Sequence, residues 1–270
     1  MSDAAVVIYE RKGPVAEITL NRPRAHNAIS PEVACRLAEI FDDIALDPNL
    51  RVVIVTGAGQ SFCAGGDLRV SIPLLSGTRK PENEWEAKVA KDLSILARSV
   101  RRDVNFDKPI IAAVNGPCLA AGTELLVSTD IRIASDRATF GLPEARHGLI
   151  PFAGALVRLT EQIPYCHAMQ MLLTAEPISA QEALRIGLIN EVVSSDDVLP
   201  RARAVASLIA RNGPFAVQTI KRTVLDSIGS RLAEAYAMED SARESVMASA
   251  DAVEGPKAFF EKRQAVFTGR

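Results

Sequence analysis

The chain has 270 residues and a mass of 29.0 kDa, enough for one large domain or two small ones and too long for a disulfide-stapled miniprotein. Hydrophobic residues make up 48% of it and charged residues 24%, so it can bury a sizeable core and does not have the composition of a disordered protein. Its 31 basic and 33 acidic residues give a net charge of -2, which argues against a broad polyanionic partner such as duplex DNA or an anionic membrane surface.

The cysteines and the apolar segments indicate a reducing compartment and no membrane anchor. Four cysteines, at positions 35, 63, 118 and 166, lie far apart without a C-x-x-C pair, so neither a zinc site nor a disulfide framework is predicted. The N-terminus meets charged residues within its first ten positions and lacks the pattern of a secretion signal. The uncharged stretch 109–123 is too short to span a bilayer. We therefore expect a cytoplasmic protein with no membrane span and no nucleic-acid partner.

Up to about residue 145, β-branched runs alternate with helical patterns, which is typical of a layered α/β domain. A strand is predicted at 15–20, ending at a turn-forming segment. A helix is expected to begin at Ser30, a suitable N-cap followed by proline at the first helical position. The continuous apolar run 51–57 predicts a strand buried on both faces.

The middle of the chain contains a polar segment and a second buried strand. Residues 71–90 are polar and contain turn formers, so we expect a variable loop that leads into a helix ending near Arg102. The elements expected after it are a strand at 108–116, a helix at 121–130 and a strand at 131–135.

The last part of the chain has a different character. From about residue 155 onward the apolar periods are helical, with stops at Gly187 and at 212–214. We find no internal repeat and no low-complexity tract. The last hundred residues are therefore predicted to be mostly helical.

Two loops of small residues, at 61–68 and at 115–124, follow the two buried strands. In an open α/β sheet, ligands bind beyond the strand ends, and small side chains let a substrate approach backbone N–H groups. The N–H groups of Ala121 and Gly122 are expected at a helix N-terminus, where the helix dipole favours negative charge. This pattern outlines an oxyanion hole, and a pair of ordinary tight turns would give the same pattern.

Two glutamates lie near these loops in apolar surroundings. Glu124 is flanked by small and aliphatic residues, and Glu144 follows a proline turn. A carboxylic acid among apolar neighbours has a raised pKa and can exchange protons near neutral pH. A solvated glutamate at a helix start fits the residues equally well.

Two other kinds of enzyme fit the first loop poorly. The segment VTGAGQSF begins like the dinucleotide-binding G-x-G-x-x-G, but Phe62 occupies the third glycine position and no G-K-[ST] follows. Ser61 lies in a small-residue loop, but the G-x-S-x-G pattern of serine hydrolases is absent.

Six segments, in order, resemble the enoyl-CoA hydratase/isomerase family of the crotonase superfamily. They are NRPRAHNAIS, SFCAGGDL, NGPCLAAGTELL, DIRIASDRATFGLPEARHGLIP, AEPISAQEALRIGLINEVV and AFFEKRQAVF, and the resemblance runs from about residue 6 to 268. It implies an α/β, crotonase-like (ClpP/crotonase) fold of repeated ββα units, with the acyl-CoA site in residues 1–200 and a helical C-terminal trimerisation region in 201–270. It also implies a homotrimer or a hexamer made of two trimers.

The resemblance also implies a set of site residues. Glu124 and Glu144 match the two hydratase glutamates, and Ala64 and Ala121 match the two backbone N–H donors to the thioester oxygen. Ala121 stands where the family usually has glycine, a change that preserves a main-chain donor if the backbone angle suits alanine. The implied substrate-binding residues are Arg24, Gly65, Gly66, Asp67, Gly122 and Lys262, with Arg24 and Lys262 near the coenzyme A phosphates.

The implied reaction is reversible addition of water across the 2,3 double bond of a trans-2-enoyl-CoA, in fatty acid or related acyl-CoA metabolism. Glu124 would deprotonate the water and Glu144 would deliver a proton to Cα. No metal or redox cofactor is implied, because coenzyme A enters as part of the substrate. The alternatives are enoyl-CoA isomerisation, dehydration of a hydroxyacyl- or carnitinyl-CoA, and acyl-CoA binding without turnover. Phe152 stands where the family commonly has glycine and is expected to narrow or reshape the acyl pocket.

Overall fold

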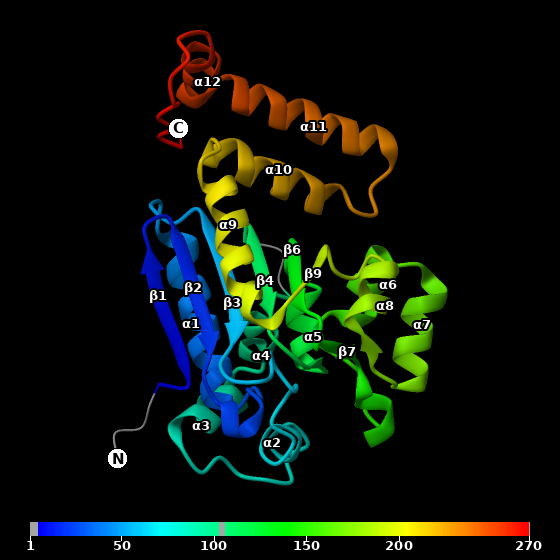
Figure 1. Ribbon diagram of the computed structural model, residues 1–270. Helices are drawn as coiled ribbons and strands as arrows, with labels where there is room; N and C mark the ends of the chain where they lie inside the picture. Colours follow the sequence, from blue (N-terminus) through cyan, green and yellow to red (C-terminus); the bar gives the residue numbers. More distant parts are fainter. Residues whose placement is uncertain (1–4, 103–105, 270) are drawn as a thin grey trace.

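A six-stranded sheet lies at the centre of the computed structural model, which describes residues 5–102 and 106–269 (Figure 1). Its strand order is β1-β2-β3-β4-β6-β9. Strand β1 pairs antiparallel with β2, and every other neighbouring pair in this sheet is parallel. The strands are β1 Val7–Lys12, β2 Val15–Leu20, β3 Val52–Gly57, β4 Ile110–Val114, β6 Ile131–Ser135 and β9 Glu191–Val193.

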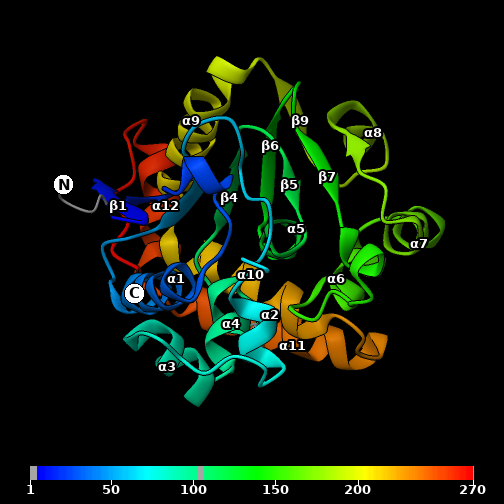
Figure 2. The same cartoon turned by 90° about the horizontal axis from the view of Figure 1, so that it is seen from below.

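Helices cover both faces of this sheet, so its central strands are apolar on both sides. Along β3, Val53 and Val55 belong to the core cluster that contains α1 (Pro31–Leu46), whereas Val52 and Ile54 pack with α9 (Val198–Ala210). Alternate residues of a strand point to opposite faces, which explains this division. Figure 2 shows α1 and α9 on opposite sides of the sheet. The prediction of a strand buried on both faces is confirmed.

The start of α1 also follows the sequence prediction. The Ser30 hydroxyl accepts a hydrogen bond from the Val33 N–H at 3.3 Å, and Pro31 is the first helical residue. Such a cap satisfies one of the N–H groups that a helix start leaves without an intrahelical partner. The helix buries an apolar stripe that includes Leu37, Phe41 and Ile44.

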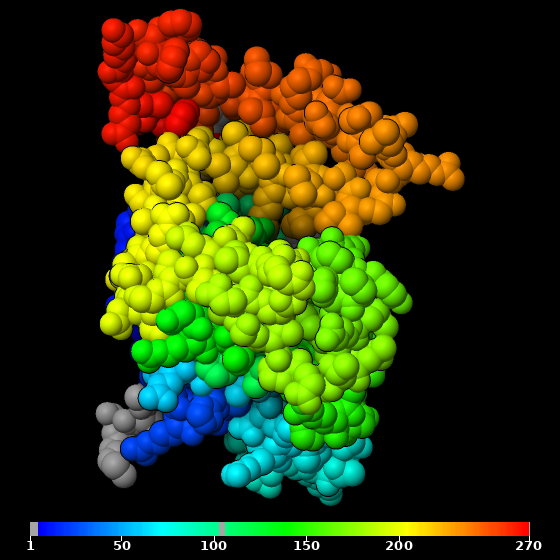
Figure 3. Space-filling view, turned by 45° about the vertical axis from the view of Figure 1, so that its right-hand side comes forward, coloured from blue at the N-terminus to red at the C-terminus, as the bar shows by residue number. Residues whose placement is uncertain are grey.

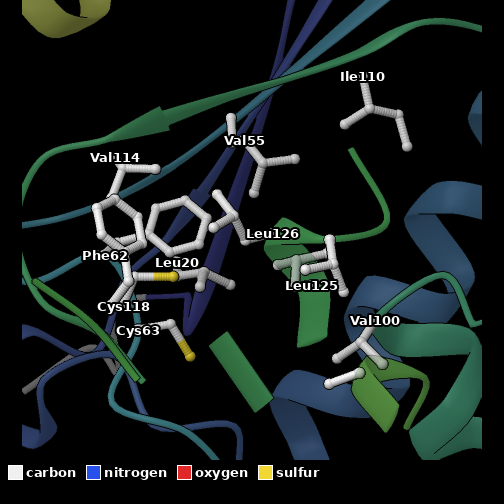
Figure 4. Close-up of a cluster of buried hydrophobic side chains, with 14 of the residues drawn as sticks. Leu20, Val55, Phe62, Cys63, Val100, Ile110, Val114, Cys118, Leu125 and Leu126 are labelled. Carbon is white, nitrogen blue, oxygen red and sulfur yellow. The ribbon is translucent and has the colours of Figure 1, made fainter. Parts of the chain in front are cut away.

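A second, three-stranded sheet begins in the loop after β4, and an isolated bridge links that loop to the loop after β3. It consists of β5 (Cys118–Leu119), β7 (Thr139–Gly141) and β8 (Ile178–Ser179), and α5 (Ala121–Leu126) begins two residues after β5. Cys63 and Cys118 form an isolated parallel bridge, and both are buried beside Leu20 and Phe62 (Figure 4). The bridge holds the loop after β3 against the loop after β4. All four cysteines are free, as the sequence predicted.

The segment expected to be a loop followed by one helix contains three short helices. These are α2 (Ser71–Leu75), α3 (Glu84–Lys91) and α4 (Ser94–Ser99). Leu74 and Val89 form a small apolar cluster with Cys35 of α1. Packing of Leu74 and Val89 against Cys35 of α1 therefore helps to order a segment that reads as polar in sequence.

The C-terminal part of the chain is helical, as predicted. Helix α9 ends at Ala210 and α10 begins at Pro214, in agreement with the stop at 212–214. The boundary expected at residue 200 falls inside α9, whose alanines pack on the sheet, so the region outside the sheet begins with α10. Helices α10 (Pro214–Ser227), α11 (Leu232–Met247) and α12 (Ala250–Phe260) project at one end of the molecule (Figures 1 and 3).

Short helices complete the described part of the chain. They are η1 Pro23–Ala25, η2 Pro143–His147, α6 Ala155–Gln162, α7 Tyr165–Thr174, α8 Ala180–Arg185 and η3 Ser195–Asp197. Helix α8 stops just before Gly187, which has φ +81°, as the sequence predicted. In residues 5–102 and 106–269 no helix is both long and apolar enough to cross a bilayer.

Candidate active site

A small pocket lies where the two loops meet α2, α4 and η2, with a cavity volume of about 80 Å³. In Figure 3, α2 (cyan) lies beside the green segment near residue 145 at the lower end of the molecule. Most of the lining is aliphatic, and its carboxyl groups are those of Glu124 and Glu144. The lining residues are Ile29, Gly66, Leu68, Ser71, Ile72, Leu75, Leu96, Ser99, Val100, Ala120, Ala121, Glu124, Glu144, Leu149, Ile150, Phe152 and Ala153.

Glu124 lies in the first turn of α5 and is 3% exposed. Its Oε1 accepts a hydrogen bond of 2.6 Å from the N–H of Ala153. Burial raises the pKa of Glu124 to about 7; the Ala153 N–H opposes this rise, and the nearby Glu144 carboxyl adds to it. A carboxyl group with this pKa can both accept and return a proton near neutral pH.

Glu144 lies in the first turn of η2, one residue after Pro143. Its Oε2 is buried and has no hydrogen-bond partner among the described residues. Burial raises the pKa of Glu144 above its ordinary value of 4.5. Two acids with raised pKa values therefore line one pocket, as the sequence predicted.

The raised pKa of Glu124 predicts a pH-dependent loss of stability. The folded chain holds this proton more tightly than the unfolded chain, so the contribution to the free energy of unfolding is fully present below about pH 4.5 and is lost as pH rises through about 7. Glutamine does not titrate. Glu124→Gln is therefore expected to melt above the wild type at about pH 8.5, with a gap that shrinks toward about pH 5. Thermal unfolding at both pH values tests this, and a gap independent of pH would contradict it.

The structure corrects the first of the two expected N–H donors. The N–H of Ala64 donates to the His26 carbonyl at 3.0 Å, and Ala64 does not line the pocket. The Ile29 N–H donates to the Gly65 carbonyl, and the Ile29 carbonyl accepts from the Asp67 N–H. The N–H of Gly66, which lies between these two residues, therefore points away from Ile29. The pocket residue of this loop is Gly66, whose N–H has no acceptor in the described ranges.

The second expected donor, Ala121, lines the pocket. It is the first residue of α5, so its N–H has no intrahelical acceptor, and its φ is not positive, so alanine fits the position. The neighbouring Ala120 instead carries the strain, with φ 51° and ψ −124°, a conformation unusual for a residue with a side chain. Gly66 and Ala121 thus present two N–H groups from two loops to one pocket.

Gly65 and Gly122, expected to bind substrate, lie behind the pocket surface. A Cβ on Gly122 would lie 2.5 Å from the Cys63 carbonyl oxygen, and one on Gly65 would lie 2.6 Å from the Ala120 Cβ. Gly65 also has φ +107°. Both glycines therefore allow the two loops to pack closely, and neither is a lining residue.

The expected polar and basic binding residues are not at the pocket either. Asp67 accepts a hydrogen bond of 3.1 Å from Arg22, which anchors the loop. Arg24 is exposed on η1, and Lys262 is exposed just after α12, at the other end of the molecule from α2 (Figure 1). Within one chain, the structure therefore does not bring Arg24, Asp67 or Lys262 into the lining.

Several lining residues were missed from the sequence. Ser71, Ile72 and Leu75 come from α2, in the segment expected to be a loop, and Leu96 comes from α4. The aliphatic character of Ile72, Leu75 and Leu96 was the available signal. The Ala153 N–H, the hydrogen-bond partner of Glu124, carries no side-chain signal at all.

Two main-chain N–H groups without acceptors among the described residues and two carboxyl groups with raised pKa values line this pocket, an arrangement that can polarise a carbonyl and move protons next to it. The sequence model of a family described as "Enoyl-CoA hydratase/isomerase" matches residues 10–270. The chain belongs to the enoyl-CoA hydratase/isomerase family, and its α/β fold with a helical C-terminal region is that of the crotonases.

Individual relatives agree over nearly the whole chain. An enoyl-CoA hydratase of Mycobacterium tuberculosis is 40% identical over 263 residues, covering 97% of this chain and 96% of the relative. The carnitinyl-CoA dehydratase of Escherichia coli K12 is 37% identical over 265 residues, covering 96% and 97%. The crystal structure of an enoyl-CoA hydratase from Bacillus anthracis superimposes with a TM-score of 0.89 at 35% identity, covering 98% of this chain and all of that one.

Proposed function

We propose that this protein adds water reversibly across the 2,3 double bond of a trans-2-enoyl-CoA thioester. The observation that carries the proposal is the pair Glu124 and Glu144 in one pocket with Gly66 and Ala121, whose N–H groups have no acceptor among the described residues. A hydratase needs a base for water, an acid for Cα and donors for the thioester oxygen.

The two N–H groups supply the electrostatic part of the mechanism. The thioester oxygen accepts hydrogen bonds from Gly66 and Ala121, and negative charge grows on this oxygen as the enolate forms. Loss of one such donor typically costs about 2.7–4 kcal/mol of transition-state stabilisation. The N-terminus of α5 adds its positive dipole end at the same place.

The two carboxyl groups supply the proton transfers. Ionised Glu124 takes a proton from water as the oxygen attacks Cβ and the double-bond electrons move toward the thioester. Protonated Glu144 then donates its proton to Cα, and the electron pair of the enolate forms the new C–H bond. The raised pKa values suit this division, because one carboxyl must be charged and the other neutral at the start.

Dehydration is the second candidate function, because the same groups run the reaction in reverse and relatives are named carnitinyl-CoA dehydratase. The lining favours an uncharged acyl tail over carnitine, whose quaternary ammonium group prefers an aromatic cage. Phe152 is the one aromatic residue among the lining residues, and it is 48% exposed.

The test follows loss of the conjugated-thioester absorbance with trans-2-enoyl-CoA substrates of increasing chain length, for the enzyme before and after treatment with EDTA. We expect turnover that survives EDTA, because the proposed steps use no metal or redox cofactor. Binding of these thioesters without any turnover would contradict the hydratase function and favour an acyl-CoA-binding protein.

The exposed surface of the C-terminal helices supports a homotrimer, alone or paired into a hexamer. Helix α11 buries none of its residues and exposes Leu232, Tyr236 and Met247. Large apolar side chains on one helical region commonly mark a protein interface. In such an assembly Lys262 of one subunit would be available to the coenzyme A of another. We also propose a cytoplasmic location, because all four cysteines are free, as is typical of a reducing compartment.

Phe152 is proposed to limit the acyl chain length. Its ring lines a cavity of only about 80 Å³, so a long tail has to displace it. Phe152→Ala is expected to raise kcat/KM for trans-2-decenoyl-CoA relative to trans-2-butenoyl-CoA by about tenfold. Tyr165→Ala, an exposed aromatic residue outside the lining, is the control. An unchanged ratio in Phe152→Ala would show that this ring does not bound the tail.

A further inference from the structure

The acyl pocket contains a buried hydroxyl group that nothing in the described chain satisfies. Ser71 is 9% exposed, and its Oγ has no hydrogen-bond partner among the described residues. The other such atom in the lining is Oε2 of Glu144, which the proposed reaction uses. Buried polar groups are nearly always paired in folded proteins, so an exception in a pocket points to a ligand.

The missing bond is particular to Ser71. The other serine of the lining, Ser99, donates from its hydroxyl to the Leu96 carbonyl at 2.8 Å. The main chain of Ser71 is also held in place, because its N–H donates to the Asp67 carbonyl at 2.8 Å. The backbone of Ser71 is therefore fixed, while its hydroxyl group has no hydrogen-bond partner among the described residues.

The lining residues that follow Ser71 in α2 are aliphatic, as expected of a surface that contacts an acyl tail. Ser71 begins α2, and the next lining residues of this helix are Ile72 and Leu75. In the proposed reaction the N–H groups of Gly66 and Ala121 bind the thioester oxygen, and the two carboxyl groups flank the double bond. The partner of Ser71 is therefore part of the chain beyond that bond.

We propose that Ser71 is a specificity-determining residue whose hydroxyl group hydrogen-bonds an oxygen substituent on a short acyl chain. The preferred substrates are then enoyl-CoA thioesters with a hydroxyl group beyond C3 rather than plain alkenoyl thioesters of the same size. This inference rests on the proposed function, because it concerns the same pocket. A purely aliphatic tail leaves the Ser71 hydroxyl buried and without a hydrogen-bond partner, and this lowers the kcat/KM for that substrate.

Isosteric substrate pairs test the inference. One member carries a terminal hydroxyl and the other a methyl group in its place: 4-hydroxy-trans-2-butenoyl-CoA against trans-2-pentenoyl-CoA, and 5-hydroxy-trans-2-pentenoyl-CoA against trans-2-hexenoyl-CoA. The kcat/KM ratio within each pair is measured for wild type, Ser71→Ala and Ser99→Ala. Ser99→Ala is the matched control because it removes a lining hydroxyl that is already bonded.

The wild type is expected to prefer the hydroxylated member of at least one pair by about tenfold, a preference that falls to about one in Ser71→Ala and persists in Ser99→Ala. A preference for the alkyl member of both pairs, or a hydroxyl preference that Ser71→Ala leaves intact, would overturn the inference. Equal rates in all three proteins would overturn it too, since Ser71 would then bond only to water.

The proposed function and this inference fail in different ways. If no thioester is hydrated, the hydratase proposal is wrong, but the binding preference remains measurable. Calorimetric Kd values for the saturated analogues, 4-hydroxybutanoyl-CoA against pentanoyl-CoA, then decide on Ser71 alone. A preference for the hydroxylated analogue that Ser71→Ala removes supports the inference, and its absence contradicts it.

Discussion

Glu124→Gln and Glu144→Gln are each expected to lower kcat for enoyl-CoA hydration by about 10² to 10⁴. Each change keeps the size of the side chain and removes its ability to exchange a proton in the pocket. The Kd of a saturated acyl-CoA should change little, because in the proposed mechanism it is the N–H groups of Gly66 and Ala121 that hold the thioester. Single-turnover absorbance measurements and calorimetric binding on the same samples separate the two effects.

The control for both variants is Glu10→Gln, an exposed glutamate of β1 outside the pocket lining. It should retain the wild-type kcat. If Glu144→Gln alone is inactive, a one-carboxylate isomerase becomes the better assignment. If both variants hydrate at the wild-type rate, the catalytic roles of Glu124 and Glu144 are wrong.

Gly122→Ala is expected to lower kcat/KM by about 10²-fold, although it adds a single methyl group. Its Cβ would lie 2.5 Å from the carbonyl oxygen and 2.8 Å from the Cβ of Cys63, so the two loops have to separate. The N–H groups of Gly66 and Ala121 come from these two loops. A displacement of about 1 Å between them is enough for a loss of this size, because two donors must meet one oxygen.

Gly255→Ala is the matched control, because its Cβ meets neighbouring atoms only at ordinary contact distances, and it lies in α12, away from the pocket. Circular dichroism and the melting temperature show whether Gly122→Ala remains folded, and the activity is then compared per folded molecule. A folded Gly122→Ala protein with the wild-type kcat/KM would show that close packing of the loops does not align the donors.

Local sequence features predicted most of the central sheet and its first helix. The continuous apolar run of β3 and the Ser30–Pro31 cap of α1 are short-range signals, and both elements form where they indicate. The edge strand β1, the short strands β5, β7 and β8, and helix α2 lack such signals. They are ordered by pairing or by contacts with distant residues, such as that of Leu74 with Cys35 of α1.

The sequence by itself determined which residue types could perform the chemistry: two glutamates in apolar segments and two loops of small residues in a fixed order. Only the tertiary structure decided which main-chain groups point into the pocket. Ala64 and Gly66 are two positions apart in one loop. The N–H of Ala64 donates to the His26 carbonyl, whereas the pairing of Gly65 and Asp67 with Ile29 leaves the N–H of Gly66 without an acceptor among the described residues. Main-chain direction depends on such long-range pairing, which side-chain identity does not encode.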